Sequence, residues 1–490
     1  MPLRCSNPDA IRKLRQALDE ARYTGATLQT HIDWEKLAPF AFGVGPMLLW
    51  RLREQPRLHS LCALFLLQMP VDEQAAATAV APASLDAMLE CGMFGREGSS
   101  IRANFRLVPV GDFYVISDLS VDLAAMRNDF VMGPSISSSN LSNTTIRKPV
   151  ARTLDLCCGS GIQAFAAAAH SNEVTGLDKN ERALKVAEFT AILNGMPNTF
   201  FRESDFFSAA EGETFDLIVA NPPYVISPNN AFQFCDGGMG ADRVSEHVVS
   251  NAGRFLNEGG YCHVQCDWAN VKGKPSEEKL RQWTAQTGCD MLVLRADSSS
   301  MDEYPLLWNL NPGSKDMVAF QQRYQPWIDH YEREGIESMT YGHIILRKRG
   351  GVENWFHVSD QFKRFPKITG AAVESLFGAV DFLKANTTME ALLEQRLVLN
   401  PDVRFDQRMQ PDAETWAVYE CVLSMVDDRV PPVSADPYIG GLCSKMNGER
   451  QLGALLVEMA AALRTQPEAL AQRYLPVIRR LIEGGFLGWQ

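Results

Sequence analysis

Four consecutive residues, Asn221, Pro222, Pro223 and Tyr224, bring together groups that could do chemistry on a planar nitrogen. The Asn221 side-chain oxygen and the Pro222 carbonyl can each accept an N–H bond, and the two prolines stiffen the turn that carries these acceptors. Tyr224 can stack on a flat amide or aromatic amine. Such a turn would orient the nitrogen and stabilise the charge that grows on it, without a catalytic histidine.

A second feature is the glycine turn in "LDLCCGSGIQAF", Leu154–Phe165. Gly159 and Gly161 let the backbone bend sharply and approach a ligand closely. The next three residues are "IQA", so the third glycine of a dinucleotide fingerprint is missing. This absence disfavours a phosphate ligand. A purely structural turn between a strand and a helix is the alternative.

Two acidic positions follow at the ends of the next strand-like runs. Asp178 ends "VTGLD" at the spacing where an acidic residue meets ribose hydroxyls, and a carboxylate can accept both hydrogen bonds of a vicinal diol. Asp205 and Phe206 follow a third run in "RESDFF". The alternative is that both acids lie in surface turns and cap helices.

In this order the motifs resemble those of class I S-adenosylmethionine-dependent methyltransferases, whose first motif is D-x-G-x-G-x-G. The Asn-Pro-Pro-Tyr tetrapeptide resembles the nitrogen-directed branch of these enzymes. That branch includes release-factor glutamine methyltransferases, adenine-N6 methyltransferases of DNA and RNA, and, with phenylalanine in the last place, guanine-N2 enzymes. The resemblance covers about Gly133–Gly260. "CDGGMGAD", Cys235–Asp242, resembles the Asp-Gly-Gly segment that follows the motif in the glutamine-directed members.

The resemblance implies S-adenosylmethionine as the cofactor and a role for each matching residue. Asn221, Pro222 and Tyr224 are expected to be catalytic, and Pro223 and Tyr224 to contact the acceptor. The expected cofactor-binding residues are Asp155, Cys157, Gly159, Gly161, Asp178, Asp205, Phe206 and Asn221. Cys157 departs from the usual glycine, which we expect to be tolerated at a negative φ and strained at a positive one.

Around these motifs, strand-like apolar runs alternate with helical stretches, which predicts an α/β fold with a doubly wound, mostly parallel seven-stranded sheet. The runs are "TLDLC", "EVTGLD", "TFFRES", "FDLIVA", "GGYCHVQC", "CDMLVLR" and "GHIILRKR". A helix at residues 316–335 is expected between the last two. Open parallel sheets bind ligands at the carboxyl ends of their strands, where the motifs fall.

The flanking regions carry helical patterns, so we expect three domains at residues 1–132, 133–350 and 351–490. The first combines helices with short strands in a winged-helix-like pattern, and the last is expected to be mostly helical, including a helix over residues 413–426. The segment "GPSISSSNLSNTT", Gly133–Thr145, is expected to be a loop whose Ser138 and Thr144 could touch the methionine end of the cofactor.

The composition indicates which partners and which cellular compartment to expect. The formal net charge of −12 disfavours polyanionic partners, although a local basic patch could still bind nucleic acid. The 11 scattered cysteines fit a reducing cytoplasm and show no metal-ligand spacing; Cys262 and Cys266 are expected to pack in a strand. The longest apolar run, Leu61–Met69, is too short for a bilayer, and the start of the chain lacks a signal-peptide core.

The sequence therefore predicts a cytoplasmic S-adenosylmethionine-dependent N-methyltransferase with no metal and no membrane association. The favoured acceptor is a glutamine-type amide of a protein or peptide, or a small molecule; an RNA or DNA base is the alternative. A non-catalytic adaptor is a third reading, supported by Cys157 alone. Four aromatic residues near the end of the sheet region could line a substrate mouth, although core packing is the more common use: Trp308, Tyr324, Trp327 and Tyr331.

Overall fold

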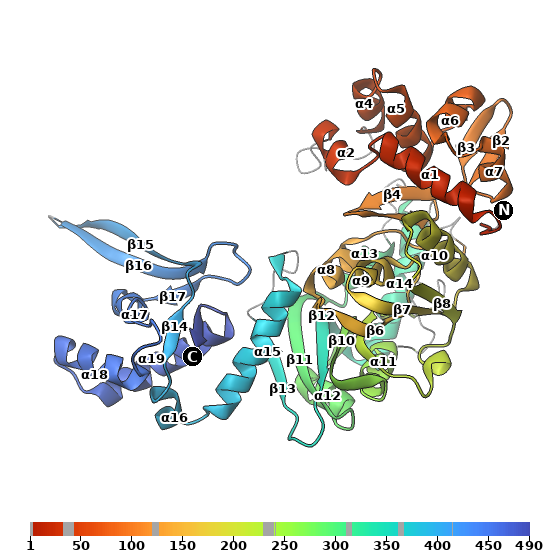
Figure 1. Ribbon diagram of the computed structural model, residues 1–490. Helices are drawn as coiled ribbons and strands as arrows, with labels where there is room; N and C mark the ends of the chain where they lie inside the picture. Colours follow the sequence, from red (N-terminus) through yellow and green to blue (C-terminus); the bar gives the residue numbers. More distant parts are fainter. Residues whose placement is uncertain are drawn as a thin grey trace. The chain divides into compact units, whose positions relative to one another are not determined.

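The computed structural model describes residues 3–32, 44–119, 127–228, 240, 242–309, 316–360, 367–413 and 415–490. The chain divides into two compact units, whose elements are shown in Figure 1. The first unit comprises Met1–Ser142, Lys148–Asp290 and Ser298–Asn354, and the second comprises Asn143–Arg147, Met291–Asp297 and Trp355–Gln490.

The N-terminal part of the first unit combines helices with short strands, as the apolar spacing predicts. Its helices are α1 (Pro8–Glu20), α2 (Gly25–His31), α4 (Val44–Arg51), α5 (Pro56–Leu61), a π-helical turn at Cys62–Leu66, α6 (Glu73–Val80) and α7 (Leu85–Glu90). Its strands are β1 (Val71–Asp72), β2 (Phe94–Glu97), β3 (Ser100–Ala103), β4 (Arg106–Val110) and β5 (Phe113–Ser117). The strands β1, β3 and β2 form one small sheet, and β4 and β5 form a hairpin.

A twisted central sheet occupies the rest of the first unit. Its strands run in the order β12-β10-β9-β6-β7-β8. Their bounds are β6 (Val150–Leu156), β7 (Ser171–Asp178), β8 (Thr199–Glu203), β9 (Phe215–Ala220), β10 (Leu256–Val271) and β12 (Ile336–Lys348). The pairs β6/β7, β6/β9, β7/β8 and β9/β10 are parallel, and β10/β12 is antiparallel. With β11 (Cys289–Ser300), all seven predicted strands are confirmed.

Helices connect these strands and cover the sheet (Figure 1). They are α9 (Ile162–Ala168), α10 (Glu181–Asn194), α11 (Arg243–Ala252), α12 (Ser276–Thr284), α13 (Tyr304–Asn309) and α14 (Met317–Glu334). Apolar strands such as β9, in which Ile218 and Val219 are buried, need this cover on both faces. The helix predicted at residues 316–335 is confirmed as α14, which follows β11 and precedes β12 in the chain.

The serine-rich segment before β6 corrects one expectation. Residues Ile136–Thr144 form a helix, α8, where composition predicted a loop. The Ser135 hydroxyl accepts the N–H of Ser138 at 3.2 Å, which satisfies a donor that the first turn of a helix leaves free. Leu141 is fully buried against Leu217 and Val219 of β9. Tertiary burial of one leucine, together with this side-chain bond, outweighs the weak helix propensity of serine and asparagine.

The second unit contains helices and several small strands. The helices are α15 (Gly370–Ala385), α16 (Met389–Leu393), α17 (Pro437–Cys443), α18 (Leu452–Leu463) and α19 (Pro467–Glu483). The strands are β13 (Phe356–Ser359), β14 (Leu397–Leu399), β15 (Val403–Asp412), β16 (Thr415–Met425), β17 (Val433–Ala435) and β18 (Leu487–Trp489). Helices predicted on the sequences of α15, α18 and α19 are confirmed.

The predicted helix over residues 413–426 is wrong, because this segment contains strand β16. It pairs antiparallel with β15 from Met425 opposite Val403 to Thr415 opposite Asp412. Near the base of the ribbon, Cys421, Leu423 and Met425 are buried while the residues between them are not, which is the period of a strand. Aromatic and β-branched side chains favour this extended form, and the pairing partner is not visible in the segment itself.

No helix among the described residues is long and apolar enough to cross a membrane.

Candidate active site

A cavity of about 370 Å³ opens in the first unit at the carboxyl ends of β6, β7, β8 and β9. Ten of the residues predicted as site residues line it: Asp155, Cys157, Gly159, Asp178, Asp205, Phe206, Asn221, Pro222, Pro223 and Tyr224. Gly161 does not line the cavity. Motifs that lie up to about seventy residues apart in sequence therefore share one pocket, because parallel strands present their carboxyl ends at the same edge of the sheet.

Two carboxylates shape the first loop, one from the buried Asp155 and one from the partly buried Asp178. Asp155, at the end of β6, accepts the N–H of Ala164 in α9 at 2.8 Å. Burial raises the pKa of Asp155 to about 8. Asp178, at the end of β7, accepts the N–H of Gly159 at 2.7 Å and that of Asn180 at 2.8 Å. Burial raises the pKa of Asp178, and these backbone bonds oppose the rise.

The glycine turn itself is left-handed at three positions. Gly161 has a φ of 87° and begins α9, and a Cβ there would lie 2.7 Å from the Phe165 ring. Gly159 has a φ of 52°. Cys157 has a φ of 59°, so the expectation that the thiol is tolerated at a negative φ is wrong. The backbone at Cys157 adopts a left-handed conformation that suits glycine, so the Cβ of the cysteine strains it.

Asp205 and Phe206 follow β8 on the rim of the cavity. The Asp205 side chain is 67% exposed, and its carboxylate lies 3.6 Å from the Lys179 ammonium. The Phe206 ring lies 4.9 Å from the ring of His247 on α11. His247 lies on α11 and His263 on β10, and neither lines the cavity.

The turn after β9 carries the acceptor groups. Pro222 is buried, and the Asn221 side-chain oxygen is buried without a hydrogen-bond partner in the described part of the chain. A buried polar atom left without a partner costs about 1–3 kcal/mol, so such atoms are rare in folded proteins unless a ligand completes them. The Asn221 oxygen is therefore a buried hydrogen-bond acceptor that no described residue satisfies.

Tyr224 is held from behind by a short chain of side chains. Its hydroxyl accepts an N–H of Gln265 at 2.8 Å, and the Gln265 carbonyl oxygen lies 3.3 Å from a ring nitrogen of His343. Burial raises the pKa of Tyr224 far above its ordinary value and lowers the pKa of His343 to about 3, so both groups are neutral at physiological pH. The phenol is thus a fixed flat surface and a poor source of a base.

An aromatic helix stands beside this turn. Trp308 on α13 lines the cavity, and it packs with Tyr224 against one hydrophobic cluster. Tyr304, one turn earlier, anchors the helix, since its hydroxyl accepts the N–H of Ile226 at 3.3 Å and donates to Asp267 at 2.5 Å. Trp327 and Tyr331 are buried in the same cluster instead. Of the four aromatic residues considered from the sequence, only Trp308 lines the cavity.

Sequence reasoning missed one wall of the cavity. Asn128, Phe130, Val131, Met132 and Gly133 line it from the segment before α8. No motif marks this wall, because its backbone and apolar side chains do the lining. In the serine segment, Ser138 lines the cavity and Thr144 does not, so contact of Ser138 with the methionine end of the cofactor stays a prediction. The segment Cys235–Asp242 lies outside the described residues apart from Gly240 and Asp242, so its predicted similarity is not tested.

Metal ligands are not assembled in the described ranges, where no group of three or more His, Cys, Asp or Glu side chains is placed to hold an ion. Cys262 and Cys266 are buried in β10, as expected for packing.

The polar groups that line the cavity fit a cofactor that carries an adenosine. Asp178 is the last residue of β7 and lines the cavity, where its two carboxylate oxygens could accept the hydrogen bonds of a ribose diol. Gly159 carries no Cβ and has open space around it, which leaves room for close approach of a ligand to the backbone. The Asn221 side-chain oxygen, which has no partner among the described residues, adds a further hydrogen-bond acceptor to the cavity.

Comparison with known families agrees with this geometry. Residues 136–266 match the family model described as "Methyltransferase small domain". Residues 20–104 and 374–488 match two models that are both described as domains of unknown function.

Curated relatives share the same central region. A release factor glutamine methyltransferase of Thermodesulfovibrio yellowstonii is 26% identical over 169 residues, which are 32% of this chain and 58% of the relative. A release factor glutamine methyltransferase of Salmonella typhimurium is 33% identical over 132 residues, which are 24% of this chain and 47% of the relative. The chain therefore spans about half the length of these relatives. A methyltransferase structure from Pyrococcus furiosus aligns at 16% identity and a TM-score of 0.27, covering 48% of this chain and 89% of that one.

Proposed function

Because residues 136–266 form a methyltransferase domain of the S-adenosylmethionine-dependent type, we propose that the chain transfers a methyl group to a planar amide or amino nitrogen. The observation that carries this proposal is the Asn221 oxygen, a buried acceptor without a partner among the described residues. It lies at the wall of the cavity that Asp155 and Asp178 also line. A nitrogen acceptor brings the N–H groups that this oxygen lacks.

In this proposal the cofactor lies along the strand ends. Asp178 binds the ribose hydroxyls, Asp155 and Gly159 shape the pocket of the methionine end, and Asp205 with Phe206 receives the adenine. S-adenosylmethionine supplies an electrophilic methyl group on a sulfonium. Asp205 is exposed and lies near Lys179, so its contact with the adenine would be made at the solvent-facing side of the cavity.

The acceptor is held by the turn after β9. The Asn221 side-chain oxygen and the Pro222 carbonyl each accept one N–H, which directs the nitrogen lone pair at the methyl group, while Tyr224 stacks on the planar group. With the cofactor bound, the two carbonyl oxygens would stabilise the positive charge that grows on the acceptor nitrogen as it takes the methyl group. The proton that nitrogen then loses would be hydrogen-bonded to one of these oxygens before it passes to solvent. Tyr224, with its raised pKa, does not take it.

For the acceptor we favour the side-chain amide of a protein or peptide glutamine. Two observations support this choice: the curated relatives are named for a release factor glutamine, and the net charge of −12 disfavours a polyanion. An adenine or guanine amino group of RNA or DNA is the alternative that the same turn could serve. Salt separates the two, since binding to nucleic acid weakens steeply as salt rises.

The decisive experiment replaces Asn221 with alanine. We expect Asn221→Ala to bind S-adenosylmethionine like the wild type by calorimetry and to lose at least about 100-fold in methyl transfer, the cost typical of removing one transition-state hydrogen bond. The readout is transfer of a radiolabelled methyl group into cell extract treated separately with nuclease and protease. Asn257→Ala is the matched control, because the Asn257 side chain bonds Asp216 away from the cavity.

Unchanged transfer by Asn221→Ala would refute the assigned role. Wild-type protein that binds no S-adenosylmethionine would instead favour the adaptor reading, for which the strained Cys157 is the supporting observation. Label that is lost with protease identifies a protein acceptor, and label that is lost with nuclease identifies a base.

A further inference from the structure

We propose that Asp118 and Arg182 form a latch that fixes one wall of the cofactor cavity and makes the N-terminal part of the chain a component of cofactor binding. The inference rests on the proposed function in one respect, namely that the cavity binds S-adenosylmethionine. Neither residue lines the cavity, so both are positioning residues.

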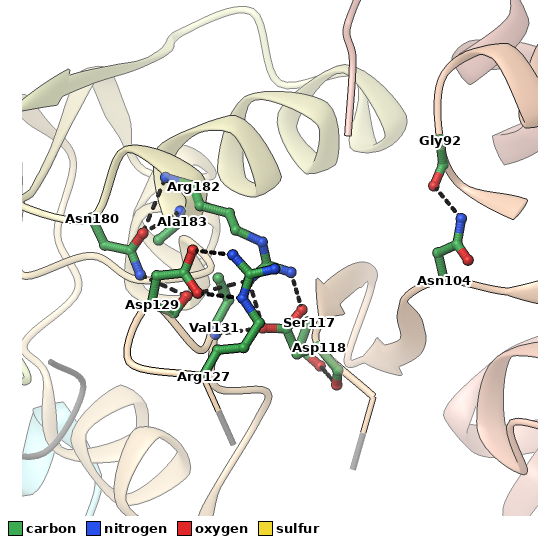
Figure 2. Close-up of polar contacts among 10 residues, drawn as sticks. All are labelled: Gly92, Asn104, Ser117, Asp118, Arg127, Asp129, Val131, Asn180, Arg182 and Ala183. Atoms are coloured by element: carbon green, nitrogen blue, oxygen red, sulfur yellow. Dashed lines mark hydrogen bonds and ion pairs between the residues drawn. The ribbon is translucent and has the colours of Figure 1, made fainter. Parts of the chain in front are cut away.

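The wall is the segment that sequence reasoning missed. Its Phe130, Val131 and Met132 line the cavity. The backbone N–H and the backbone carbonyl of Val131 both bond to Asp118. The N–H of Asp118 donates to the Val131 carbonyl at 3.0 Å, and the N–H of Val131 donates to the Asp118 carboxylate at 2.8 Å. Figure 2 shows this contact at the centre of a group of polar side chains. Asp118 therefore sets the position of the wall directly.

Arg182, in the first turn of α10, holds Asp118 in turn. Its two terminal nitrogens bond the two carboxylate oxygens, one of them at 2.6 Å, in a bidentate pair. One of these nitrogens also donates to the Asp129 carbonyl in the wall at 3.2 Å. The two side chains are only 23% and 11% exposed, so water screens the pair weakly. A bidentate Arg–carboxylate pair is both stronger and more directional than a single ionic contact.

The same helix start connects the wall to the expected ribose site. Asn180 caps α10 and donates through its side chain to the Asp129 carbonyl at 3.0 Å, while its backbone N–H bonds Asp178 at 2.8 Å. Asp178, Asn180 and Arg182 thus lie within five residues. Asn180 and Arg182 hold the wall, and Asp178 and Asn180 line the cavity. A shift of the wall therefore changes the shape of the pocket around the Asp178 carboxylate, which is expected to bind the ribose.

Asp118 itself follows β5 of the N-terminal hairpin, which is fastened to the far end of α10. The backbone N–H and carbonyl of Tyr114 in β5 each bond the Asn194 side chain at 2.8 Å. Val186 and Phe189 of α10 belong to the hydrophobic core of the N-terminal helices. The latch is thus the last of a series of contacts that run from this core, along α10, to the cofactor cavity.

A second ion pair in the same segment provides the control. Arg127 bonds Asp129 in a bidentate pair at 2.7 Å for both contacts, as Figure 2 shows, but the Arg127 side chain is 68% exposed. It joins Arg127, which precedes the wall, to Asp129 in the wall and does not tie the wall to α10. An exposed pair of this kind contributes little.

The test measures the dissociation constant of S-adenosylmethionine by calorimetry on the full chain. We expect Arg182→Gln and Asp118→Asn each to weaken binding about ten-fold or more, because each breaks a half-buried charge pair. Asp118→Asn keeps an oxygen that can accept the Val131 N–H, so it removes the charge with the least disturbance of the fold. Arg127→Gln is expected to change the constant less than about two-fold.

Three further measurements separate a positioning role from loss of the fold. Arg182→Lys keeps the charge and loses the fork, so we expect it to recover part of the affinity that Arg182→Gln loses. In the double variant the two losses should be far from additive, because both remove the same pair. Thermal unfolding without ligand identifies any variant that is simply unfolded.

Wild-type affinity in Arg182→Gln and Asp118→Asn would overturn the latch, and so would an equal loss in Arg127→Gln. Failure of the wild type to bind S-adenosylmethionine would instead contradict the proposed function, which keeps the two failures distinct.

Discussion

At the scale of single residues, the strained Cys157 leads to a stability prediction. A left-handed residue other than glycine costs about 1–2 kcal/mol, whereas glycine adds about 0.5–1 kcal/mol of unfolded-state entropy. We therefore expect Cys157→Gly to stabilise the fold slightly, by on the order of 0.5 kcal/mol. Denaturant unfolding measures it, with Cys158→Gly as the matched control. Cys158 is buried and has a negative φ, so glycine there should destabilise the fold. A loss of stability in both variants would contradict the strain argument.

The raised pKa of Asp155 has a consequence for stability against pH. The folded carboxyl titrates near about 8 and the unfolded one near 3.8, so between these values the folded state binds more protons. Its contribution to stability is complete below the unfolded pKa and is lost as the pH rises through the folded value. Asp155→Asn cannot ionise and should remove this part of the slope. Thermal midpoints between about pH 5 and about pH 9 measure the effect.

Glu213→Gln is the control for that experiment. Its pKa is lowered by Arg202 and Arg152, so its contribution is already complete at pH 5 and is lost only as the pH falls further. Its slope above pH 5 should match that of the wild type. Identical slopes in the wild type and in Asp155→Asn would show that Asp155 is not the source.

At the scale of elements, helix α13 is expected to form part of the acceptor pocket. Trp308 lines the cavity beside Tyr224, and Tyr304 anchors the helix to the segment after the turn. We expect Trp308→Ala to leave the affinity for S-adenosylmethionine unchanged and to lower labelled methyl transfer about ten-fold. Tyr324→Ala on α14 is the control, because the Tyr324 hydroxyl bonds the Asp302 carbonyl and its side chain does not line the cavity. A fall in cofactor affinity would place Trp308 on the cofactor side instead.

The elements also show what the sequence could and could not predict. The seven strands of the sheet region were predictable because strands buried on both faces are continuous apolar runs. The end of each parallel strand then fixes where Asp178 and Asn221 must lie. Helix α8 was not predictable, because it depends on the burial of Leu141 against another strand. Strand β16 was not either, because an isolated apolar face does not distinguish a helix from a strand whose partner is unknown.

The same distinction holds within the site. Ten of the predicted motif residues line the cavity, since each motif combines a residue type with a strand end, but their roles stay predictions. The wall at 128–133 was not found, because it depends on backbone bonds to Asp118, whose importance no local pattern reveals. The turn at Cys157 shows the limit of residue type alone: only the backbone angle decides whether a cysteine is strained there.

At the scale of the whole molecule, the N-terminal part shares its hydrophobic core with α10. The boundary predicted between residues 132 and 133 stays a prediction, and it can be tested directly. We expect a truncated chain starting at residue 133 to be largely unfolded or aggregated, because it exposes Val186 and Phe189, both fully buried in the intact chain. Near-ultraviolet circular dichroism and size-exclusion chromatography measure this. A monomeric, cooperatively folding fragment would contradict it.

The Cys157 thiol also gives this pocket a nucleophile that a reactive ligand can modify covalently. Adenosine analogues that carry a mild electrophile toward the first loop would bond to it covalently, whereas a methyltransferase with the usual glycine offers no nucleophile at that point. Because burial raises the pKa of the thiol, the capture would be slow at neutral pH and would accelerate in alkali. A strained position in the backbone would thus become the basis for an inhibitor that distinguishes this protein from others with the same cofactor.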